Sequence, residues 1–344
     1  MTQDAEWMQL ALDQARLGVG KTSPNPPVGA VIVKDNQCLG SGWHRAAGMP
    51  HAEREAIADA ISRHGAESLH GATIYITLEP CSTFGRTPPC TDGIIHAGIK
   101  RVVYACDDPN PHHAGNAKKL LDEAEISVTL GVLESAALDL LRPFYKIQTT
   151  GLPWIIWKVA MSLDGRITRP AGEGQWLSGE ASREDVQRLR ATVDAILTSG
   201  ATVRSDRPAL TIRNPEWLEG RSQPWRWVIS NHPESLPRDA PLFCDAWSER
   251  TSVHAGDDLR ELLAHLAKKH AVNCVLVEAG GKLAGSLFAA GLVDEVVCYY
   301  APLLCGGPVL ALAGDALPDS IKLLDSSYQQ IGDDIRLRAR VARS

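Results

Sequence analysis

The sequence lacks long apolar runs and has no surplus of positive charge. Its 344 residues include 35 Lys and Arg against 41 Asp and Glu, which gives a formal net charge of −6 at pH 7. No cluster of Lys and Arg stands out, and a nucleic-acid partner would call for a concentrated basic surface. No apolar run approaches the roughly 20 residues of a membrane span. We therefore expect neither nucleic acid nor a membrane as partner.

A signal-peptide pattern and a disulfide framework are also missing. The first residues, Met1 to Glu6, are polar and acidic instead of basic and then apolar. Eight cysteines are too few in a chain of this length for a disulfide-rich protein. Two of them belong to the motif described below. We expect buried, reduced thiols at the other six, and hence a cytoplasmic protein: Cys38, Cys106, Cys244, Cys274, Cys298 and Cys305.

The length and composition are those of an ordinary globular protein with more than one domain. A chain of 344 residues exceeds the usual size of a single domain, so two domains are expected. Hydrophobic residues make up 44% and charged residues 22%, both typical of folded globular proteins.

The most informative motif is His51-Ala52-Glu53, followed by Pro80-Cys81 and Pro89-Cys90. One imidazole and two thiols are ligands that Zn²⁺ prefers, and three protein ligands leave a fourth position for water. This order of residues is typical of zinc nucleobase deaminases, in which the Glu moves protons and does not bind the metal. We predict His51, Cys81 and Cys90 as zinc ligands and Glu53 as the catalytic acid/base. A closed structural zinc site is disfavoured, because hydrolysis needs a carboxylate beside an open position.

The first half of the chain alternates strands and helices, which predicts a three-layer α/β domain. Helices are expected at 4–17, 52–64, 116–124 and 134–148, and strands at 28–33, 38–43, 73–77, 101–105 and 126–130. In the helix 52–64 we expect Ile57, Ala60 and Ile61 to face inward. His51 and Glu53 would lie at the start of that helix and Cys90 in the first turn of another, so two helix N-termini converge on the metal.

The second half begins after a turn at 149–153 and contains a strand that runs into Gly280-Gly281-Lys282. Strands are expected at 154–161, 195–198, 225–229 and 293–301, helices at 180–191 and 282–290, and a hairpin at 321–341. Backbone N–H groups at the start of the helix 282–290 could bind phosphate. A tight turn without a ligand fits this pattern about equally well. The pattern is not the Gly-x-Gly-x-x-Gly dinucleotide fingerprint, so it does not predict a Rossmann fold.

Two further motifs resemble a known family. The loop Gly85-Arg86-Thr87-Pro88-Pro89-Cys90 resembles that of the riboflavin-pathway deaminase. Ser162-Leu163-Asp164-Gly165-Arg166 and Gln175-Trp176 resemble the riboflavin-pathway reductase. The chain is thus similar, over roughly residues 4 to 340, to the bifunctional deaminase–reductase family of that pathway. This implies a cytidine-deaminase-like three-layer α/β/α domain over residues 1–148 and a dihydrofolate-reductase-like α/β domain over residues 149–344.

The resemblance also implies two successive reactions. The first is zinc-dependent hydrolytic deamination of 2,5-diamino-6-ribosylamino-4(3H)-pyrimidinone 5′-phosphate. The second is NADPH-dependent reduction of the ribosyl group, which gives 5-amino-6-ribitylaminouracil 5′-phosphate. The expected cofactors are Zn²⁺ and NADPH, the expected partner is a small phosphorylated pyrimidine, and the expected assembly is a homo-oligomer.

In the deaminase half, the resemblance implies substrate contacts at Asn25, His44, Arg86 and Asn110. From the sequence alone, Asn25 could simply be a turn residue between prolines. A lone histidine at a strand end, such as His44, is usually a surface residue. The family commonly has histidine two residues after the first zinc cysteine, whereas this chain has Thr83, which puts one substrate contact in doubt.

In the reductase half, the resemblance implies contacts with NADPH and with the substrate. The NADPH contacts are Ala160, Trp176, Thr202, Asp206, Asn231, Gly280, Gly281, Lys282, Leu283, Ala284, Gly285 and Ser286. The substrate contacts are Gly174, Arg190, Leu210, Arg213 and Glu278. Gly174 and Asn231 stand where serine is frequent in the family. Arg190 and Arg213 suit phosphate, because a guanidinium matches its oxygens, although solvated surface arginine is the simpler interpretation.

Two other functions are compatible with parts of the sequence. The first is a polynucleotide-editing deaminase whose second half binds RNA, which the net charge of −6 opposes. The second is a deaminase fused to a catalytically silent, nucleotide-binding half. NADPH oxidation with the deaminated intermediate distinguishes this last possibility from a reductase.

Overall fold

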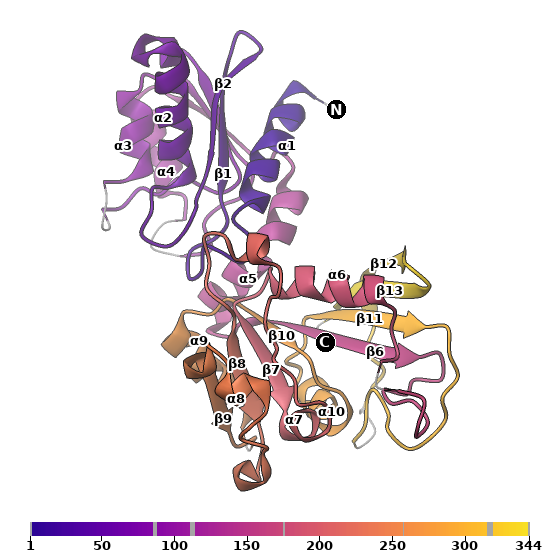
Figure 1. The fold of residues 1–344 in the computed structure, drawn as a ribbon. Helices are drawn as coiled ribbons and strands as arrows, with labels where there is room; N and C mark the ends of the chain where they lie inside the picture. The colour runs from indigo at the N-terminus through magenta and orange to yellow at the C-terminus, as the bar shows by residue number, and fades with distance from the viewer. Residues whose placement is uncertain are drawn as a thin grey trace. The chain divides into compact units, whose positions relative to one another are not determined.

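The computed structural model describes residues 2–84, 88–110, 114–174, 176–256, 258–314 and 319–342. The chain forms two compact units, Met1–Gly151 and Leu152–Ser344. Each unit is an α/β structure built on one mixed sheet (Figure 1). Among the described residues, no helix is long and apolar enough to cross a membrane.

The first unit has a five-stranded sheet in the order β2-β1-β3-β4-β5. Strand β1 runs antiparallel to β2 and β3, while β3, β4 and β5 are mutually parallel. The elements are α1 (Gln3–Arg16), β1 (Gly29–Lys34), β2 (Gln37–Trp43), α2 (Ala52–His64), β3 (Thr73–Ile76), α3 (Cys90–His96), β4 (Arg101–Tyr104), α4 (Asn116–Glu123), β5 (Ser127–Leu130) and α5 (Glu134–Thr150).

Side chains along each strand point alternately to the two faces of the sheet, which divides the core of this unit into two layers. In β1, Ala30 and Ile32 pack with α2, α3 and α4, whereas Val31 and Val33 pack with α1 and α5. Successive side chains of a strand point to opposite faces, so this short apolar strand supplies both layers. The helices thus cover both faces of the sheet, which confirms the three-layer prediction (Figure 1).

The second unit has an eight-stranded sheet in the order β12-β13-β11-β6-β10-β7-β8-β9. The strands from β11 to β9 in this order are parallel, and β12 and β13 form an antiparallel hairpin at one edge. The strands are β6 (Trp154–Ser162), β7 (Ala195–Ser199), β8 (Trp225–Ile229), β9 (Thr251–His254), β10 (Cys274–Val277), β11 (Glu295–Ala301), β12 (Leu323–Ile331) and β13 (Asp334–Val341). The α-helices are α6 (Glu180–Arg190), α7 (Gly200–Asp206), α8 (Pro241–Cys244), α9 (Leu259–His270) and α10 (Gly281–Ala289).

Most elements lie where the sequence predicts them, but two expectations about burial are wrong. Ile61 is 42% exposed, because it lies at the edge of the apolar stripe of α2 that Ala56 and Ala60 occupy. All eight cysteines fall within the described residues and all are free thiols. Cys38 and Cys244 are nevertheless exposed, since each lies in a peripheral element that leaves one side open to solvent, and Cys305 is only half-buried because it lies in a loop after β11.

Candidate active sites

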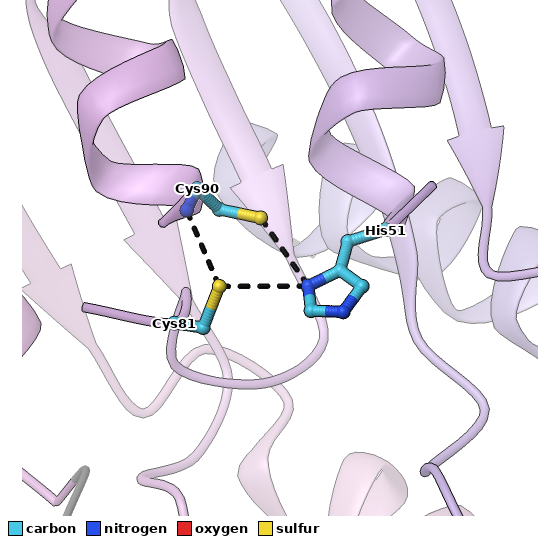
Figure 2. Close-up of side chains that lie close together, drawn as sticks. All are labelled: His51, Cys81 and Cys90. Carbon is cyan, nitrogen blue, oxygen red and sulfur yellow. Dashed lines mark hydrogen bonds between the residues drawn. The ribbon is translucent and has the colours of Figure 1, made fainter. Parts of the chain in front are cut away.

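Three side chains from separate segments of the first unit meet at one point. The Nδ1 atom of His51 lies 3.5 Å from Sγ of Cys81 and 3.4 Å from Sγ of Cys90 (Figure 2). The three ligand atoms all lie within 4.8 Å of one another. Among the described residues this is the one group of three or more His, Cys, Asp or Glu side chains that could hold a metal ion.

The backbone explains why these side chains converge. His51 is the N-cap of α2, and Cys90 is the first residue of α3, directly after the N-cap Pro89. Cys81 lies in the loop that leaves β3, and the backbone N–H of Cys90 donates a hydrogen bond of 3.2 Å to its sulfur. The two helix N-termini direct their positive ends at the sulfur atoms, which favours thiolates.

The spacing of the donor atoms fits a zinc ion. Zn–S bonds of about 2.3 Å and a Zn–N bond of about 2.0 Å at tetrahedral angles place sulfur and nitrogen about 3.5 Å apart. The observed distances between His51 and the two sulfurs are 3.5 and 3.4 Å. Three donors of this kind leave one tetrahedral position for water, as in catalytic zinc sites.

The two thiols have opposite pKa shifts. A hydrogen bond from the Cys90 thiol is the largest cause that lowers the pKa of Cys81, which falls to about 4. The same hydrogen bond, together with burial, raises the pKa of Cys90. A dication that binds both sulfur atoms would bind them as thiolates, so metal binding at this pair is coupled to proton release. Hydrogen bonding to Cys81 also raises the pKa of His51.

Glu53 lies two residues after His51, on the first turn of α2, and is 3% exposed. Burial is the main cause that raises the pKa of its carboxyl group, and the negative charge of Cys81 adds to the shift. A carboxyl group whose pKa moves towards neutrality can both take up and release a proton at working pH. This is the property expected of an acid/base residue.

Asn25 and His44 form a hydrogen-bonded pair. His44 is 3% exposed, which excludes the interpretation as a surface histidine. Its Nδ1 lies 3.0 Å from the carbonyl oxygen of Pro50, and since a carbonyl can only accept, Nδ1 carries the proton. Nε2 then accepts from the Asn25 amide at 2.9 Å. Burial lowers the pKa of His44, so the ring is neutral. The ring centroid lies 5.3 Å from that of His51.

The loop that carries Asn110 is anchored by a residue that sequence reasoning missed. The buried Glu79 carboxylate accepts hydrogen bonds from the backbone N–H groups of Asp108, Gly115 and Ala117, at 3.2, 3.1 and 3.1 Å. Glu79 directly precedes Pro80-Cys81 in the sequence. Arg86, also expected to contact substrate, lies outside the described residues.

In the second unit a cavity of about 420 Å³ lies at the carboxyl ends of the parallel strands β6, β7 and β10. Open α/β sheets bind ligands at this edge, and the volume is in the range of ligand pockets. The cavity brings together nine of the residues expected to contact NADPH or substrate: Ala160, Trp176, Thr202, Asp206, Gly280, Arg190, Leu210, Arg213 and Glu278. Its other charged lining residues are Lys158, Arg183 and Arg207.

Opposite charges are balanced at the base of this cavity. Arg190 donates to both carboxylate oxygens of Glu278, at 2.6 and 3.0 Å, and Nζ of Lys158 lies 4.0 Å from Glu278. Burial alone would raise the pKa of Glu278, but the charges of Arg190 and Lys158 outweigh it, so the pKa is lowered. Burial lowers the pKa of Lys158. Sequence reasoning missed Lys158, although a lysine within the apolar strand β6 is a usable signal.

The remaining expected residues do not line this cavity. Gly174, Asn231 and the segment 281–286 are absent from its walls. The Oδ1 atom of Asn231 accepts a hydrogen bond from the backbone N–H of Gly256. The N–H of Gly281, expected to be available to phosphate, donates to the carbonyl of Ala311 at 3.0 Å.

Comparison with known proteins defines the class of each unit. Residues 1–106 match the family model described as cytidine and deoxycytidylate deaminase zinc-binding region. Residues 153–337 match the model described as RibD C-terminal domain. The chain therefore joins a zinc-binding deaminase domain to a reductase domain.

Full-length relatives show the family. The riboflavin biosynthesis protein RibD of Escherichia coli strain K12 is 41% identical, with 97% of this chain and 98% of that protein covered. The Haemophilus influenzae RibD is 39% identical, with 98% and 97% covered. A solved structure of Acinetobacter baumannii RibD superposes with a TM-score of 0.88 at 38% identity, with 99% of each chain covered. The chain belongs to the RibD family of bifunctional riboflavin-biosynthesis enzymes, which use Zn²⁺ and NADPH.

We expect Cys81→Ser to lower the zinc content of the purified protein well below one ion per chain, because a serine hydroxyl is a poor zinc ligand at neutral pH. Metal analysis after dialysis measures this directly. Cys106→Ser is the matched control, since Cys106 is a buried thiol in the same unit outside the donor triangle. Equal zinc in Cys81→Ser and the parent would contradict the ligand assignment.

Proposed function

We propose that the first unit deaminates 2,5-diamino-6-ribosylamino-4(3H)-pyrimidinone 5′-phosphate and that the second unit reduces the ribosyl group of the product with NADPH. The observation that carries this proposal is the donor triangle of His51, Cys81 and Cys90 beside the buried carboxyl group of Glu53. The Thermotoga maritima relative, 30% identical with a TM-score of 0.86, is named a diaminohydroxyphosphoribosylaminopyrimidine deaminase/5-amino-6-(5-phosphoribosylamino)uracil reductase.

In the deamination, water adds to the amino-bearing ring carbon, the C–N bond breaks and ammonia leaves. His51, Cys81 and Cys90 would hold the Zn²⁺ ion, which would lower the pKa of the attacking water. Glu53 takes up the proton released as oxygen adds, and passes it to the departing amino group. The raised pKa of Glu53 suits both halves of this transfer.

Asn25, His44, Arg86 and Asn110 are the proposed contacts for this substrate. The pairing of Asn25 with His44 fixes the orientation of the amide, because its NH₂ group donates to Nε2 of the ring. The amide oxygen of Asn25 is then directed away from that bond and can accept from the N–H edge of a pyrimidine. The role of His44 in orienting the Asn25 amide accounts for a neutral, buried ring so close to His51.

For the reduction, the cavity of the second unit would orient NADPH and the substrate. Bound NADPH would supply the hydride for C1′ of the opened ribosyl group, and a proton from water would complete the reduction. Arg190 is already paired with Glu278 and donates a third hydrogen bond to the carbonyl of Thr211, at 3.0 Å. Among the described residues Arg213 forms no ion pair. Arg213 is therefore the better candidate for the substrate phosphate, because its charge is not neutralised by a carboxylate at contact distance.

We further propose contacts with NADPH from Ala160, Trp176, Thr202, Asp206, Asn231 and the segment Gly280 to Ser286, and with the substrate from Gly174, Leu210 and Glu278. We place the domain boundary near residues 148–151, where α5 ends. A reducing, cytoplasmic location agrees with the eight free thiols. We also propose that the protein forms a homo-oligomer, and only the family resemblance supports this.

We expect Glu53→Gln to retain zinc but to lose about 10²- to 10⁴-fold in deamination, the usual contribution of a general acid/base. The assay follows ammonia release and NADPH absorbance together, with the diamino substrate. The parent should release ammonia and oxidise NADPH, whereas Glu53→Gln should do neither. Supplied with the deaminated intermediate, Glu53→Gln should oxidise NADPH at the rate of the parent. Normal ammonia release by Glu53→Gln would remove Glu53 from the mechanism.

Arg213→Ala should impair the reduction alone. We expect a rise of about tenfold or more in the KM for the deaminated phosphorylated intermediate, since a charge-assisted contact with phosphate is lost. Ammonia release from the diamino substrate should stay at the level of the parent. Arg188→Ala is the control, because Arg188 is an exposed arginine on α6 that pairs with Glu184. Equal loss of both activities in Arg213→Ala would argue against separate sites.

A further inference from the structure

The segment 209–213 forms one wall of the reductase cavity, yet it belongs to neither a helix nor a strand. Ala209, Leu210, Thr211 and Arg213 line the cavity, while Ile212 between the last two is 2% exposed and turned away from it. Leu210 has a φ of 53°, which is rare for a residue with a branched side chain. Such a backbone conformation persists only where the surrounding structure holds it.

Side chains replace the neighbouring strand that this segment lacks. The Gln223 amide accepts from the N–H of Ile212 and donates to its carbonyl, both at 2.8 Å. This double pairing with one residue is the pattern that two residues of antiparallel strands make with each other. On either side of Ile212, Arg190 donates to the carbonyl of Thr211 at 3.0 Å, and Gln187 accepts from the N–H of Arg213 at 2.8 Å.

Gln223 differs from the other two anchoring residues because it does not line the cavity. It is 3% exposed and lies two residues before β8, behind Ile212. Arg190 and Gln187 both line the cavity and are therefore within reach of a ligand. Any effect of Gln223 on a ligand must pass through the backbone of Ile212.

We propose that Gln223 is a positioning residue for the reduction: its amide sets the backbone of Ile212, and thereby the placement of Leu210 and Arg213 against the phosphorylated substrate. This inference rests on the proposed function of the second unit. Removing one partner of a buried backbone group leaves that group unsatisfied, so the segment must shift to find another. The shift displaces Arg213 directly, because Arg213 is the next residue along the chain.

The proposal predicts a selective effect on KM. Gln223→Leu removes both hydrogen bonds at similar volume, and Gln223→Glu keeps the acceptor but, when ionised, loses the donor. In both variants we expect the KM for the deaminated phosphorylated intermediate to rise about tenfold or more, whereas the KM for NADPH stays within about twofold of the parent. A smaller fraction of folded protein would lower the apparent kcat and leave both KM values unchanged. A general distortion of the cavity would raise the KM for NADPH as well as the KM for the intermediate.

The pH dependence of Gln223→Glu provides a rescue experiment. A buried carboxyl group titrates above its usual range, and when protonated it both donates and accepts. The substrate KM of Gln223→Glu should therefore fall towards that of the parent as the pH is lowered from about 8 to about 6. The substrate KM of Gln223→Leu should show no such recovery relative to the parent.

Asp294→Asn is the matched control. The buried Asp294 carboxylate accepts from the backbone N–H of Ile155 at 2.7 Å and does not line the cavity. We expect this variant to lower the thermal unfolding midpoint without changing either KM. An unchanged substrate KM in Gln223→Leu, an equal rise in both KM values, or the same selective rise in Asp294→Asn would overturn the proposal.

A binding measurement separates this inference from the proposed function. Ribose 5-phosphate, which carries the sugar phosphate of the proposed substrate, is titrated into the parent, Gln223→Leu and Asp294→Asn by calorimetry. Weaker binding in Gln223→Leu alone supports the positioning role even if the parent fails to oxidise NADPH with the intermediate. Equal affinity in all three proteins contradicts it.

Discussion

The deaminase unit depends on the convergence of two helix N-termini on one cluster of donor atoms. His51 caps α2 and Cys90 begins α3, so the positive ends of both helices face the sulfur atoms and the imidazole. Without that field, two thiolates packed against a buried carboxyl group would repel one another. The same field, together with a bound metal ion, would neutralise the site, which agrees with the burial of Glu53 at 3% exposure and with its proposed role as an acid/base.

In the reductase unit, side chains alone balance a buried negative charge. Glu278 is placed between Arg190 and Lys158 at the carboxyl edge of the parallel strands, so the negative charge is balanced within the cavity wall. Arg213 remains available for a phosphate. Much of this wall is an irregular segment, and its backbone groups are paired by side-chain amides and a guanidinium instead of by a sheet neighbour. One of these anchoring residues, Gln223, does not line the cavity, so the binding surface is shaped in part from behind its wall.

The fold class and the metal cluster could be predicted from the sequence because short motifs and the local pattern of apolar residues indicate both. Pro89-Cys90 and His51 reveal helix starts, and the ligand types identify the metal. Gln223 gave no local signal, because its role depends on a contact with Ile212 that only the fold creates. Lys158 stands out as a charge within an apolar strand, but its partner Glu278 is brought to it only by the pairing of β6 with β10. Periodicity also could not fix the edge of the apolar stripe of α2, so the burial of Ile61 was predicted wrongly.

We propose that three protein ligands hold the metal ion and leave one coordination position open. X-ray absorption at the zinc K-edge of the purified, ligand-free protein tests it most directly. We expect two sulfur neighbours at about 2.3 Å and two nitrogen or oxygen neighbours at about 2.0 Å, of which one is imidazole. A third sulfur or a second imidazole would close the coordination sphere, and either result would contradict a hydrolytic role for this site.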